Sequence, residues 1–381
     1  MITDVVVIGA GLAGLSTAYH LAESGIRRMV VLEQEKKIGG HASGRNAGMI
    51  RQPVEDPVLA ILARQGRDSL ERAERLGWDI RFRSNGSLFL SAGNSPSEID
   101  KLKKVSDRAG IQTRFIRPSE VSAIHPVLKA CSFKKALYCP NDALVDIGLL
   151  LGGFLKALKA AEVPMQFGVS LKSIRKIEGS FKIETSNKTI LTKKIVNAAG
   201  AWAGLVGQIA GASKVPLKAY RRHLFFTKQY VSDNTELWPF VWDLGLGFYF
   251  RPMSGKLLLS PCDHTRERVT PANEALSREE KIDPRMQKIL IQKARHFSPY
   301  FSKLEVSGAQ SGLRTMAPDG RFIVGEDPKL RGFFWCAGLG GHGVTTCFSV
   351  GRLTGDLVSG QSTDKVLARA LSPARFSRKN K

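Results

Sequence analysis

Three glycines near the N-terminus have the spacing of a turn that binds phosphate groups. The run Gly-Ala-Gly-Leu-Ala-Gly occupies residues 9–14, and an acidic residue, Glu33, follows it. Gly9 permits a tight turn, Gly11 lets the backbone approach a pyrophosphate, and Gly14 lets a helix pack closely on a strand. A carboxylate at position 33 can accept hydrogen bonds from ribose hydroxyls and would repel a 2′-phosphate. The spacing therefore predicts a dinucleotide site.

The elements around these glycines are those that such a site needs. Residues 5–8 form a β-branched run typical of a buried strand, residues 12–23 repeat apolar side chains at helical spacing, and residues 29–32 form a second buried run. Residues 39–50 are rich in glycine and small polar side chains, as expected of a loop that approaches a ligand. A lone glycine motif also occurs in unrelated turns, and it does not by itself distinguish FAD from NAD.

Four stretches of the chain resemble the D-amino-acid oxidase superfamily of FAD-dependent oxidoreductases, which includes glycine oxidase, sarcosine oxidase and D-arginine dehydrogenase. They are GGHASGRNAG at 39–48, VNAAGAW at 196–202, SGLRTMAPDG at 311–320 and GLGGHGVT at 338–345. They are similar, in that order, to the family's first flavin loop, second cofactor strand, substrate-arginine segment and C-terminal flavin loop. The resemblance implies FAD as cofactor.

The resemblance and the glycine motif together imply a cofactor site in four parts of the chain. Backbone amides at the start of a helix near Val344 can stabilise negative charge on a reduced flavin. The expected cofactor-binding residues are Gly9, Gly11, Ala13, Gly14, Glu33, Gln34, His41, Ala42, Ser43, Gly44, Arg45, Asn46, Ala47, Gly48, Val169, Ala199, Gly200, Gly338, Gly340, Gly341, His342, Gly343, Val344 and Thr345.

FAD is expected to bind without a covalent bond. Sarcosine oxidases attach FAD through a cysteine shortly after the substrate arginine, and this chain has Thr315 and Met316 there. His41 is the one residue that could challenge this expectation, but its place in the loop resembles non-covalent members. No metal site is expected, because the five cysteines are scattered and form no CxxC pair.

Arg314 is the best candidate for a substrate ligand, since a guanidinium group can clamp a carboxylate with two hydrogen bonds. The resemblance places Tyr249, Gly341 and one of the adjacent arginines at 221 and 222 beside it, and we select Arg222. Without the resemblance, those two arginines could equally be a solvated pair at the start of a strand. His342 could be catalytic, but an orienting or space-filling role is as plausible.

The chain departs from its relatives in three places. D-arginine dehydrogenase has an acidic residue in the strand that residues 85–88 represent, and none occurs here. Gly48 replaces an active-site histidine of that relative, which is expected to leave more room over the flavin. Thr345 replaces a lysine that sarcosine oxidases use in oxygen activation. We therefore expect an amino acid with a free carboxylate and a small or apolar side chain, such as glycine or a D-amino acid, or a secondary amine such as proline or sarcosine. The expected electron acceptor is O2, a quinone or a carrier protein.

The expected reaction is oxidation of an amino acid. Hydride would pass from the substrate Cα to flavin N5, and the imine would hydrolyse to a 2-oxo acid without a strong protein base. One alternative is oxidation of a 2-hydroxy acid or glycerol 3-phosphate, which would need His342 or His223 as a base. Another is a non-catalytic flavoprotein subunit of an electron-transfer complex.

The fold is expected to be a mixed α/β class with two domains. A Rossmann-like FAD domain with a parallel sheet would contain residues 1–82, 146–218 and 313–381, and a substrate domain with a mostly antiparallel sheet would contain 83–145 and 219–312. Helices are expected at 57–76, 97–109, 146–161 and 345–359, and strands at 87–91, 180–184, 189–191, 194–198, 224–227, 247–252, 256–260 and 333–337.

Charge and composition predict the setting of the protein. Its 57 basic and 34 acidic residues give a formal net charge of +23, which favours contact with an anionic membrane or an acidic protein. The odd number of cysteines and the lack of a long apolar run favour a cytoplasmic protein, in peripheral contact with the inner membrane face at most. No nucleic-acid partner is expected. The C-terminal segment could be a basic, surface-binding tail containing Lys365, Arg369, Arg375, Arg378, Lys379 and Lys381.

Overall fold

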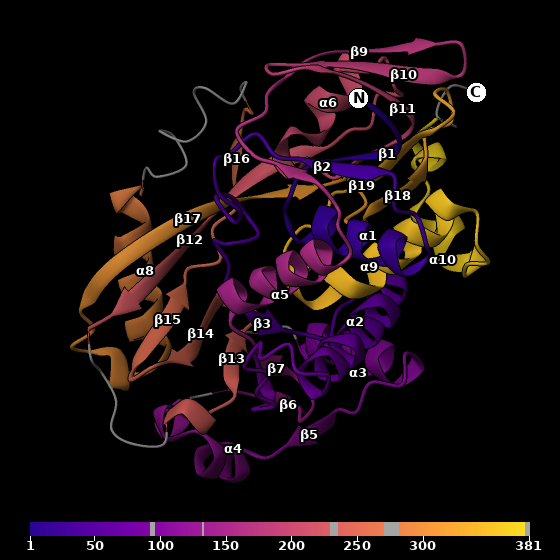
Figure 1. Ribbon diagram of the computed structural model, residues 1–381. Helices are drawn as coiled ribbons and strands as arrows, with labels where there is room; N and C mark the ends of the chain where they lie inside the picture. The colour runs from indigo at the N-terminus through magenta and orange to yellow at the C-terminus, as the bar shows by residue number, and fades with distance from the viewer. Residues whose placement is uncertain (92–95, 132, 229–234, 270–281, 378–381) are drawn as a thin grey trace.

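The computed structural model describes residues 1–91, 96–131, 133–228, 235–269 and 282–377. Two large sheets dominate it, one in the upper half of Figure 1 and one in the lower left half, with helices between and beside them. No helix within the described ranges is long and apolar enough to cross a membrane.

The first sheet is built around the expected strand, helix and strand. Its central strands are parallel, and β18 pairs with β19 in the antiparallel sense. A meander of three antiparallel strands, β9, β10 and β11, extends from it. The strands are β1 (Ile2–Ile8), β2 (Met29–Leu32), β8 (Met165–Gln166), β9 (Leu171–Ile177), β10 (Ser180–Thr185), β11 (Thr189–Asn197), β18 (Ile323–Glu326) and β19 (Phe333–Ala337), with the main order β18-β19-β11-β1-β2-β8.

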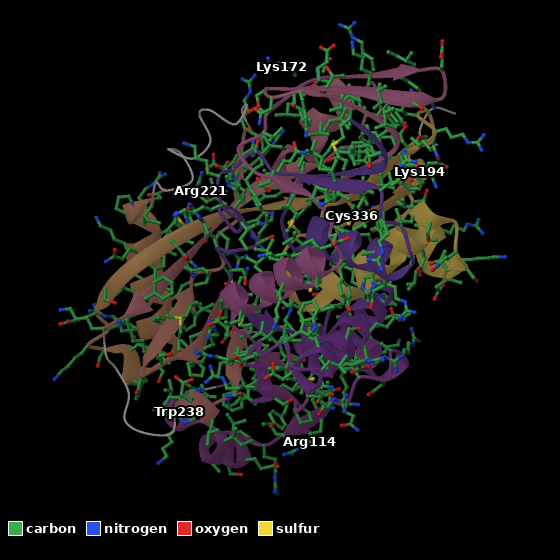
Figure 2. All side chains as sticks on the ribbon, viewed as in Figure 1. Arg114, Lys172, Lys194, Arg221, Trp238 and Cys336 are labelled. Carbon is green, nitrogen blue, oxygen red and sulfur yellow. The ribbon has the colours of Figure 1, made fainter. Side chains whose placement is uncertain are left out.

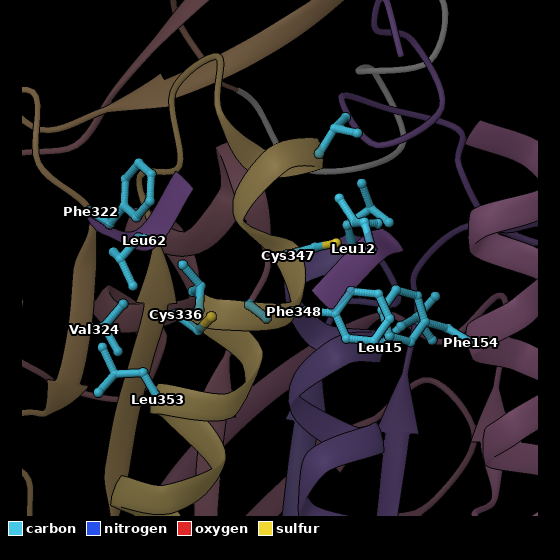
Figure 3. Close-up of a cluster of buried hydrophobic side chains, with 14 of the residues drawn as sticks. Leu12, Leu15, Leu62, Phe154, Phe322, Val324, Cys336, Cys347, Phe348 and Leu353 are labelled. Carbon is cyan, nitrogen blue, oxygen red and sulfur yellow. The ribbon is translucent and has the colours of Figure 1, made fainter. Parts of the chain in front are cut away.

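Both faces of β1 are buried because different layers cover them. Val5 and Val7 pack with the helices, whereas Val6 and Ile8 pack with the side chains of the β9–β10 meander. Figure 3 shows the helical side of this core, where side chains of α1, α2, α5 and α9 meet those of β19 and the β18 region. These helices are α1 (Leu12–Glu23), α2 (Pro57–Arg75), α5 (Ile147–Ala160) and α9 (Gly343–Ser359).

The second sheet is mostly antiparallel. Among the strand pairs that the structure describes in this sheet, only the pair β13–β4 is parallel, and the others are antiparallel. Its strands are β4 (Ser87–Ser91), β5 (Arg114–Ile116), β6 (Lys135–Cys139), β12 (Lys218–Thr227), β13 (Phe240–Asp243), β14 (Phe248–Met253), β15 (Lys256–Ser260), β16 (Thr265–Glu267) and β17 (Val306–Met316). Smaller elements are β3 (Met49–Ile50), β7 (Ala143–Leu144), α3 (Pro96–Arg108), α4 (Pro118–Ile124), α6 (Ala203–Ile209), α8 (Pro284–Phe297) and α10 (Lys365–Leu371).

The mixed α/β class with a parallel and a mostly antiparallel sheet is confirmed, and the expected helices agree within two residues at their ends. The expected separate strands at 189–191 and 194–198 are wrong, because β11 is one strand that pairs first with β10 and then with β1 and β19. The strand expected at 224–227 is the end of the longer β12. Its partner β17 was missed. The domain boundaries stay a prediction.

The C-terminal segment is not a free tail as far as residue 377. Helix α10 lies against β18 in the structure, and Arg375 donates to the Asp319 carboxylate at 2.7 Å. Arg378, Lys379 and Lys381 lie outside the described residues. Basic side chains also occur elsewhere on the molecule, such as Lys172 of β9 and Lys194 of β11 in the first sheet, both labelled in Figure 2.

Candidate active site

A cavity of about 860 Å³ joins the two sheets. Its wall contains the glycine turn after β1, the 39–48 loop, the end of β11, the loop before α9 and parts of β12, β14 and β17. This volume lies within the range of cofactor and ligand sites. Of the residues predicted to bind cofactor or substrate, all line the cavity except Gly14, Gly44, His342 and Thr345.

The glycine turn is shaped by close backbone contacts. Gly9 has φ +106°, and a Cβ there would lie 2.5 Å from the Ala198 carbonyl oxygen. A Cβ on Gly14 would lie 1.9 Å from the Gly9 carbonyl oxygen. Gly14 therefore acts in helix-to-strand packing, which explains why it does not line the cavity, and only glycine fits at either position.

Glu33 is held at the end of β2 by backbone amides. Its Oε2 accepts from the Ala10 N–H at 2.8 Å, and its Oε1 accepts from the Glu35 N–H at 3.0 Å. Each carboxylate oxygen keeps further lone pairs for a ligand, because an ionised carboxylate has about four acceptor positions. The side chain therefore lines the cavity in a fixed orientation beside the glycine turn.

The 39–48 loop folds over the start of α1. The Ser43 hydroxyl accepts from the Leu12 N–H at 2.9 Å, so the loop contacts the first turn of the helix. Asn46 holds the loop itself, since its Nδ2 donates to the Ala42 and Ser43 carbonyl oxygens and its Oδ1 accepts from the Gly48 N–H. The loop is therefore an organised part of the wall.

Two glycines of this loop are required by packing. A Cβ on Gly44 would lie 2.0 Å from the Gly39 carbonyl oxygen. Gly48 has φ +62°, and a Cβ there would lie 2.5 Å from the Val145 carbonyl oxygen. A histidine at position 48 would clash with that backbone, so the glycine has a steric reason besides any room that it leaves over a flavin.

His41 is engaged with other side chains of the wall. Its Nε2 lies 2.8 Å from Glu35 Oε1, and its ring lies 4.5 Å from that of Trp202. Glu35 and Trp202 also line the cavity. These contacts fix the imidazole against the wall.

The loop before α9 forms another part of the cavity wall. The Gly340 N–H donates to the Thr315 carbonyl oxygen at 2.9 Å, which joins this loop to β17. Helix α9 begins at Gly343, and Gly343 and Val344 line the cavity with the free amides of a helix start. An anionic group bound there would be stabilised by these amides.

The predicted substrate ligands meet at the other end of the cavity. Arg222 on β12, Tyr249 on β14 and Arg314 on β17 all line it, and the Arg222 guanidinium lies 5.9 Å from the Tyr249 ring centre. The Nε atoms of Arg222 and Arg314 are buried without a hydrogen-bond partner. Burial, together with the charge of Arg222, lowers the pKa of Arg314 to about 10, so both remain cations near neutral pH.

The structure distinguishes the two adjacent arginines of β12. Neighbouring residues of a strand point to opposite faces. Arg221 points away from the cavity, where its Nε donates to Glu267 at 2.7 Å and its NH1 donates to the Ser311 hydroxyl. Arg222 faces the cavity.

The two candidate bases do not lie in the cavity wall. Burial, followed by the charges of Arg51 and Arg314, lowers the pKa of His342 to about 3. The Nδ1 of His223 lies 2.8 Å from Asp263, and its Nε2 accepts from the Asp283 N–H. His342 is therefore a neutral neighbour of the site, and both ring nitrogens of His223 are engaged elsewhere.

Sequence reasoning missed two residues at the substrate end. Trp242 of β13 lines the cavity next to Tyr249, with ring centres 4.8 Å apart. Arg51, which follows β3, covers the Trp242 ring at 4.4 Å and contacts His342 Nε2 at 3.3 Å. The one signal for Arg51 in the sequence is its position directly after the glycine-rich loop. Nothing in the sequence indicates Trp242, because a strand far away in the chain brings it there.

The cavity fits FAD by its own geometry. At one end, Gly9 and Gly11 form a backbone turn that leaves no room for a side chain, because a Cβ on Gly9 would lie 2.5 Å from the Ala198 carbonyl oxygen and one on Gly11 2.8 Å from Ser43 Oγ, and Glu33 also lines this part of the cavity. At the other end, the loop before α9 lies beside Arg314, since a Cβ on Gly341 would be 3.7 Å from Arg314 NH1. A dinucleotide cradle joined to a cationic end that suits a carboxylate defines a flavin-dependent oxidoreductase.

A family comparison agrees with this class. The model of the FAD-dependent oxidoreductase family, also called DAO, matches residues 4–357. The chain belongs to this family, and FAD is its cofactor.

Several similar proteins are named as enzymes that oxidise amino acids or N-methyl amino acids. Human mitochondrial sarcosine dehydrogenase is 27% identical over 359 residues, which are 90% of this chain and 38% of that protein. The chain thus spans well under half the length of that relative. A solved L-proline dehydrogenase from P.horikoshii has TM-score 0.88 at 21% identity and covers 99% of this chain and 98% of its own. Glycine oxidase from Geobacillus kaustophilus has TM-score 0.80 at 25% identity and covers 98% and 99%.

Proposed function

We propose that the chain oxidises an amino acid, either a primary one such as glycine or a D-amino acid, or a secondary one with an N-alkyl group. The observation that carries this proposal is the pair of buried Nε donors of Arg222 and Arg314, which face one cavity without a partner. Arg314 NH2 also contacts the Asp263 carbonyl oxygen and His264 Nδ1, but no carboxylate of the described residues forms an ion pair with either arginine. A buried cation without such a partner is costly, so the pair suits a site that an anionic ligand completes. A free carboxylate matches both guanidinium groups.

The roles of the residues follow from their positions. Arg314 and Arg222 would hold the carboxylate, and Gly341, close to Arg314, leaves space beside it. Burial raises the pKa of the Tyr249 phenol, which therefore stays neutral and can donate to the same carboxylate. When bound, FAD supplies the acceptor for the two electrons and the hydrogen that leave the substrate Cα. Positioning by these three side chains is then the protein's main contribution.

FAD would be held by the wall from Gly9 to Val344 without a covalent bond. The residues after Arg314 are Thr315 and Met316, neither of which carries a thiol. The described wall contains one cysteine, Cys336, and burial raises the pKa of its thiol, so it is a poor nucleophile. Denaturation should therefore release all flavin from the protein.

An amine donor is favoured over an alcohol. Oxidation of a hydroxy acid needs a base for the hydroxyl proton. His342, with a pKa of about 3, is too weak for that role, and His223 lies outside the cavity wall. An amine that enters in its neutral form needs no such base.

The electron acceptor is proposed to be a quinone or a carrier protein rather than O2. Thr345 stands where sarcosine oxidases have a lysine, and its hydroxyl accepts from the Arg51 N–H at 3.0 Å. We expect fast reduction of a quinone analogue and slow oxygen consumption with the same substrate. The positive net charge would suit docking to an anionic membrane or an acidic carrier.

The direct test is the flavin spectrum of the FAD-loaded protein without oxygen. Glycine, D- and L-amino acids, sarcosine, proline, 2-hydroxy acids and glycerol 3-phosphate would be added one at a time. Bleaching by an amino-acid class alone supports the proposal. Bleaching by a hydroxy acid or glycerol 3-phosphate would replace it with the alcohol reaction, and bleaching by none would favour a non-catalytic flavoprotein subunit.

A further inference from the structure

Arg51 is a third cation close to the substrate end of the cavity, although the residues that line the cavity do not include it. Its guanidinium covers one ring of the Trp242–Tyr249 pair, and the Arg222 guanidinium lies against the other ring. The two ring centres are 4.8 Å apart, so the two cations lie on neighbouring rings of one aromatic pair. The charge of Arg222 acts on Arg51 and on Arg314, which places the three cations in one electrostatic cluster.

The hydrogen bonding of Arg51 is incomplete. Within the described residues, its guanidinium has one hydrogen-bond contact, NH2 with His342 Nε2 at 3.3 Å. The neutral imidazole accepts this bond and adds no negative charge. The side chain is also partly exposed, so its remaining donors are available to a ligand.

No carboxylate of the described residues contacts any of the three guanidinium groups as an ion pair. The nearby Asp142 accepts from the Gln52 N–H, the Gln52 amide, the Ser87 hydroxyl and the Cys139 thiol. The Asp263 carboxylate accepts from the backbone and the ring of His223. The acids of this region are thus committed elsewhere, and three clustered cations lack a contacting anion.

One carboxylate does not complete this arrangement. Arg222 and Arg314 already supply enough donors for both oxygens of one carboxylate. Asp142 acts on Arg51 electrostatically without contacting it, so Arg51 would remain a cation without a contacting anion, which is costly in a partly buried site. A second anionic group on the ligand would remove that cost.

We propose that the substrate is an amine carrying two carboxylates, with the second carboxylate bound by Arg51 against the face of Trp242. This inference rests on the proposed function, since it assigns the first carboxylate to Arg222 and Arg314. The second carboxylate can stand on the nitrogen substituent, as in iminodiacetate, or on the Cα side chain, as in aspartate. Arg51 is then the residue that selects dicarboxylates over glycine and sarcosine.

The test uses thioethers, which have no amine to oxidise, titrated into the FAD-loaded protein and followed by the flavin spectrum. (Methylthio)acetate has one carboxylate, thiodiacetate has a second on the other side of the sulfur, and (methylthio)succinate has a second on the side chain. At least one dicarboxylate should bind about 10- to 100-fold tighter than (methylthio)acetate, the usual effect of hydrogen bonds to a charged group. Equal dissociation constants for all three would overturn the inference.

Variants assign the effect to Arg51. R51Q should reduce the preference for the dicarboxylate to less than about threefold, R51K should keep part of it, and both should still bind (methylthio)acetate. R117Q, at an exposed arginine far from the cavity, is the matched control and should keep the full preference. If R51Q does not fold, R51K and the comparison of ligands on the wild-type protein still test whether Arg51 causes the dicarboxylate preference.

The outcomes separate this inference from the proposed function. If (methylthio)acetate binds and amino acids bleach the flavin, but neither dicarboxylate binds more tightly, only the inference fails. If no thioether binds and no amine bleaches the flavin, both fail. A dicarboxylate preference that R51Q leaves intact would also contradict the role of Arg51.

Discussion

The two ends of the cavity are built in different ways. The cofactor end consists of backbone and small side chains, and its polar groups bond to one another, as Glu33 does with the Ala10 and Glu35 amides. The substrate end consists of large side chains from separate strands, and the Nε donors of Arg222 and Arg314 there lack partners. The Glu33 side chain at the first end is thus held by bonds within the protein, whereas the Nε donors at the second end are left for a ligand to satisfy. Substitutions should accordingly affect folding and cofactor content at one end, and substrate recognition at the other.

The largest effect is expected at Gly14, on the cofactor side. G14V would place side-chain carbons against the Gly9 carbonyl oxygen, because even a Cβ there lies 1.9 Å from it. The variant should lose about 3 kcal/mol of unfolding free energy or fail to fold, and it should purify without flavin. Denaturant unfolding and the absorbance ratio of flavin to protein measure this.

Gly152 is the matched control, since it lies on the exposed face of α5 with nothing within 4 Å of a Cβ. G152A should keep full flavin content and gain up to about 1 kcal/mol of stability. Full flavin content in G14V would show that the close helix-to-strand contact is not required.

The next effect compares adjacent residues on β12. R222Q removes a cation that faces the cavity and should lower kcat/KM for the amino-acid substrate by about 100-fold, with little change in flavin content. R221Q removes contacts with Glu267 and Ser311 outside the cavity, and should change kcat/KM by less than about threefold. Steady-state kinetics on both variants check the comparison. Equal losses would mean that the face of the strand does not decide the role.

A pH effect on stability is expected from Asp142, behind the substrate end. Burial raises its pKa from 3.8 to about 6. Between these two values the folded protein keeps a proton that the unfolded chain has lost, so Asp142 lowers stability as pH rises, by about 3 kcal/mol in total. Relative to wild type, D142N should therefore gain stability from pH 4 to pH 7 in denaturant unfolding. A difference that does not change with pH would contradict the raised pKa.

The smallest effect concerns His342. Because its pKa lies near 3, the imidazole is neutral from pH 5 to pH 8 and does not titrate there. The shape of the kcat/KM profile over this range should be the same in H342N as in wild type, even if the rate differs. An inflection near pH 6.5 that disappears in H342N would assign a titrating role to this residue.

Local spacing in the sequence indicates the cofactor end, whereas the substrate end was indicated chiefly by the family resemblance. The glycines at 9, 11 and 14 follow one another along the chain, so their spacing encodes a local turn, and steric contact enforces it. Arg221 and Arg222 could not be separated by type or spacing. Only the pleat of β12 and its pairing with β17 show which of them faces the cavity.

The chain by itself determined the strand, helix and strand around the glycine turn, the acidic residue after it and the family to which the protein belongs. These features depend on local periodicity and on backbone conformations that few residues can adopt. Tertiary structure alone decided that Arg51 lies on Trp242, that Asp142 is buried beside Gln52, and that β11 pairs with three strands, β10, β1 and β19. Such contacts join residues from distant parts of the chain, and the energies that create them arise only when the sheets have packed together.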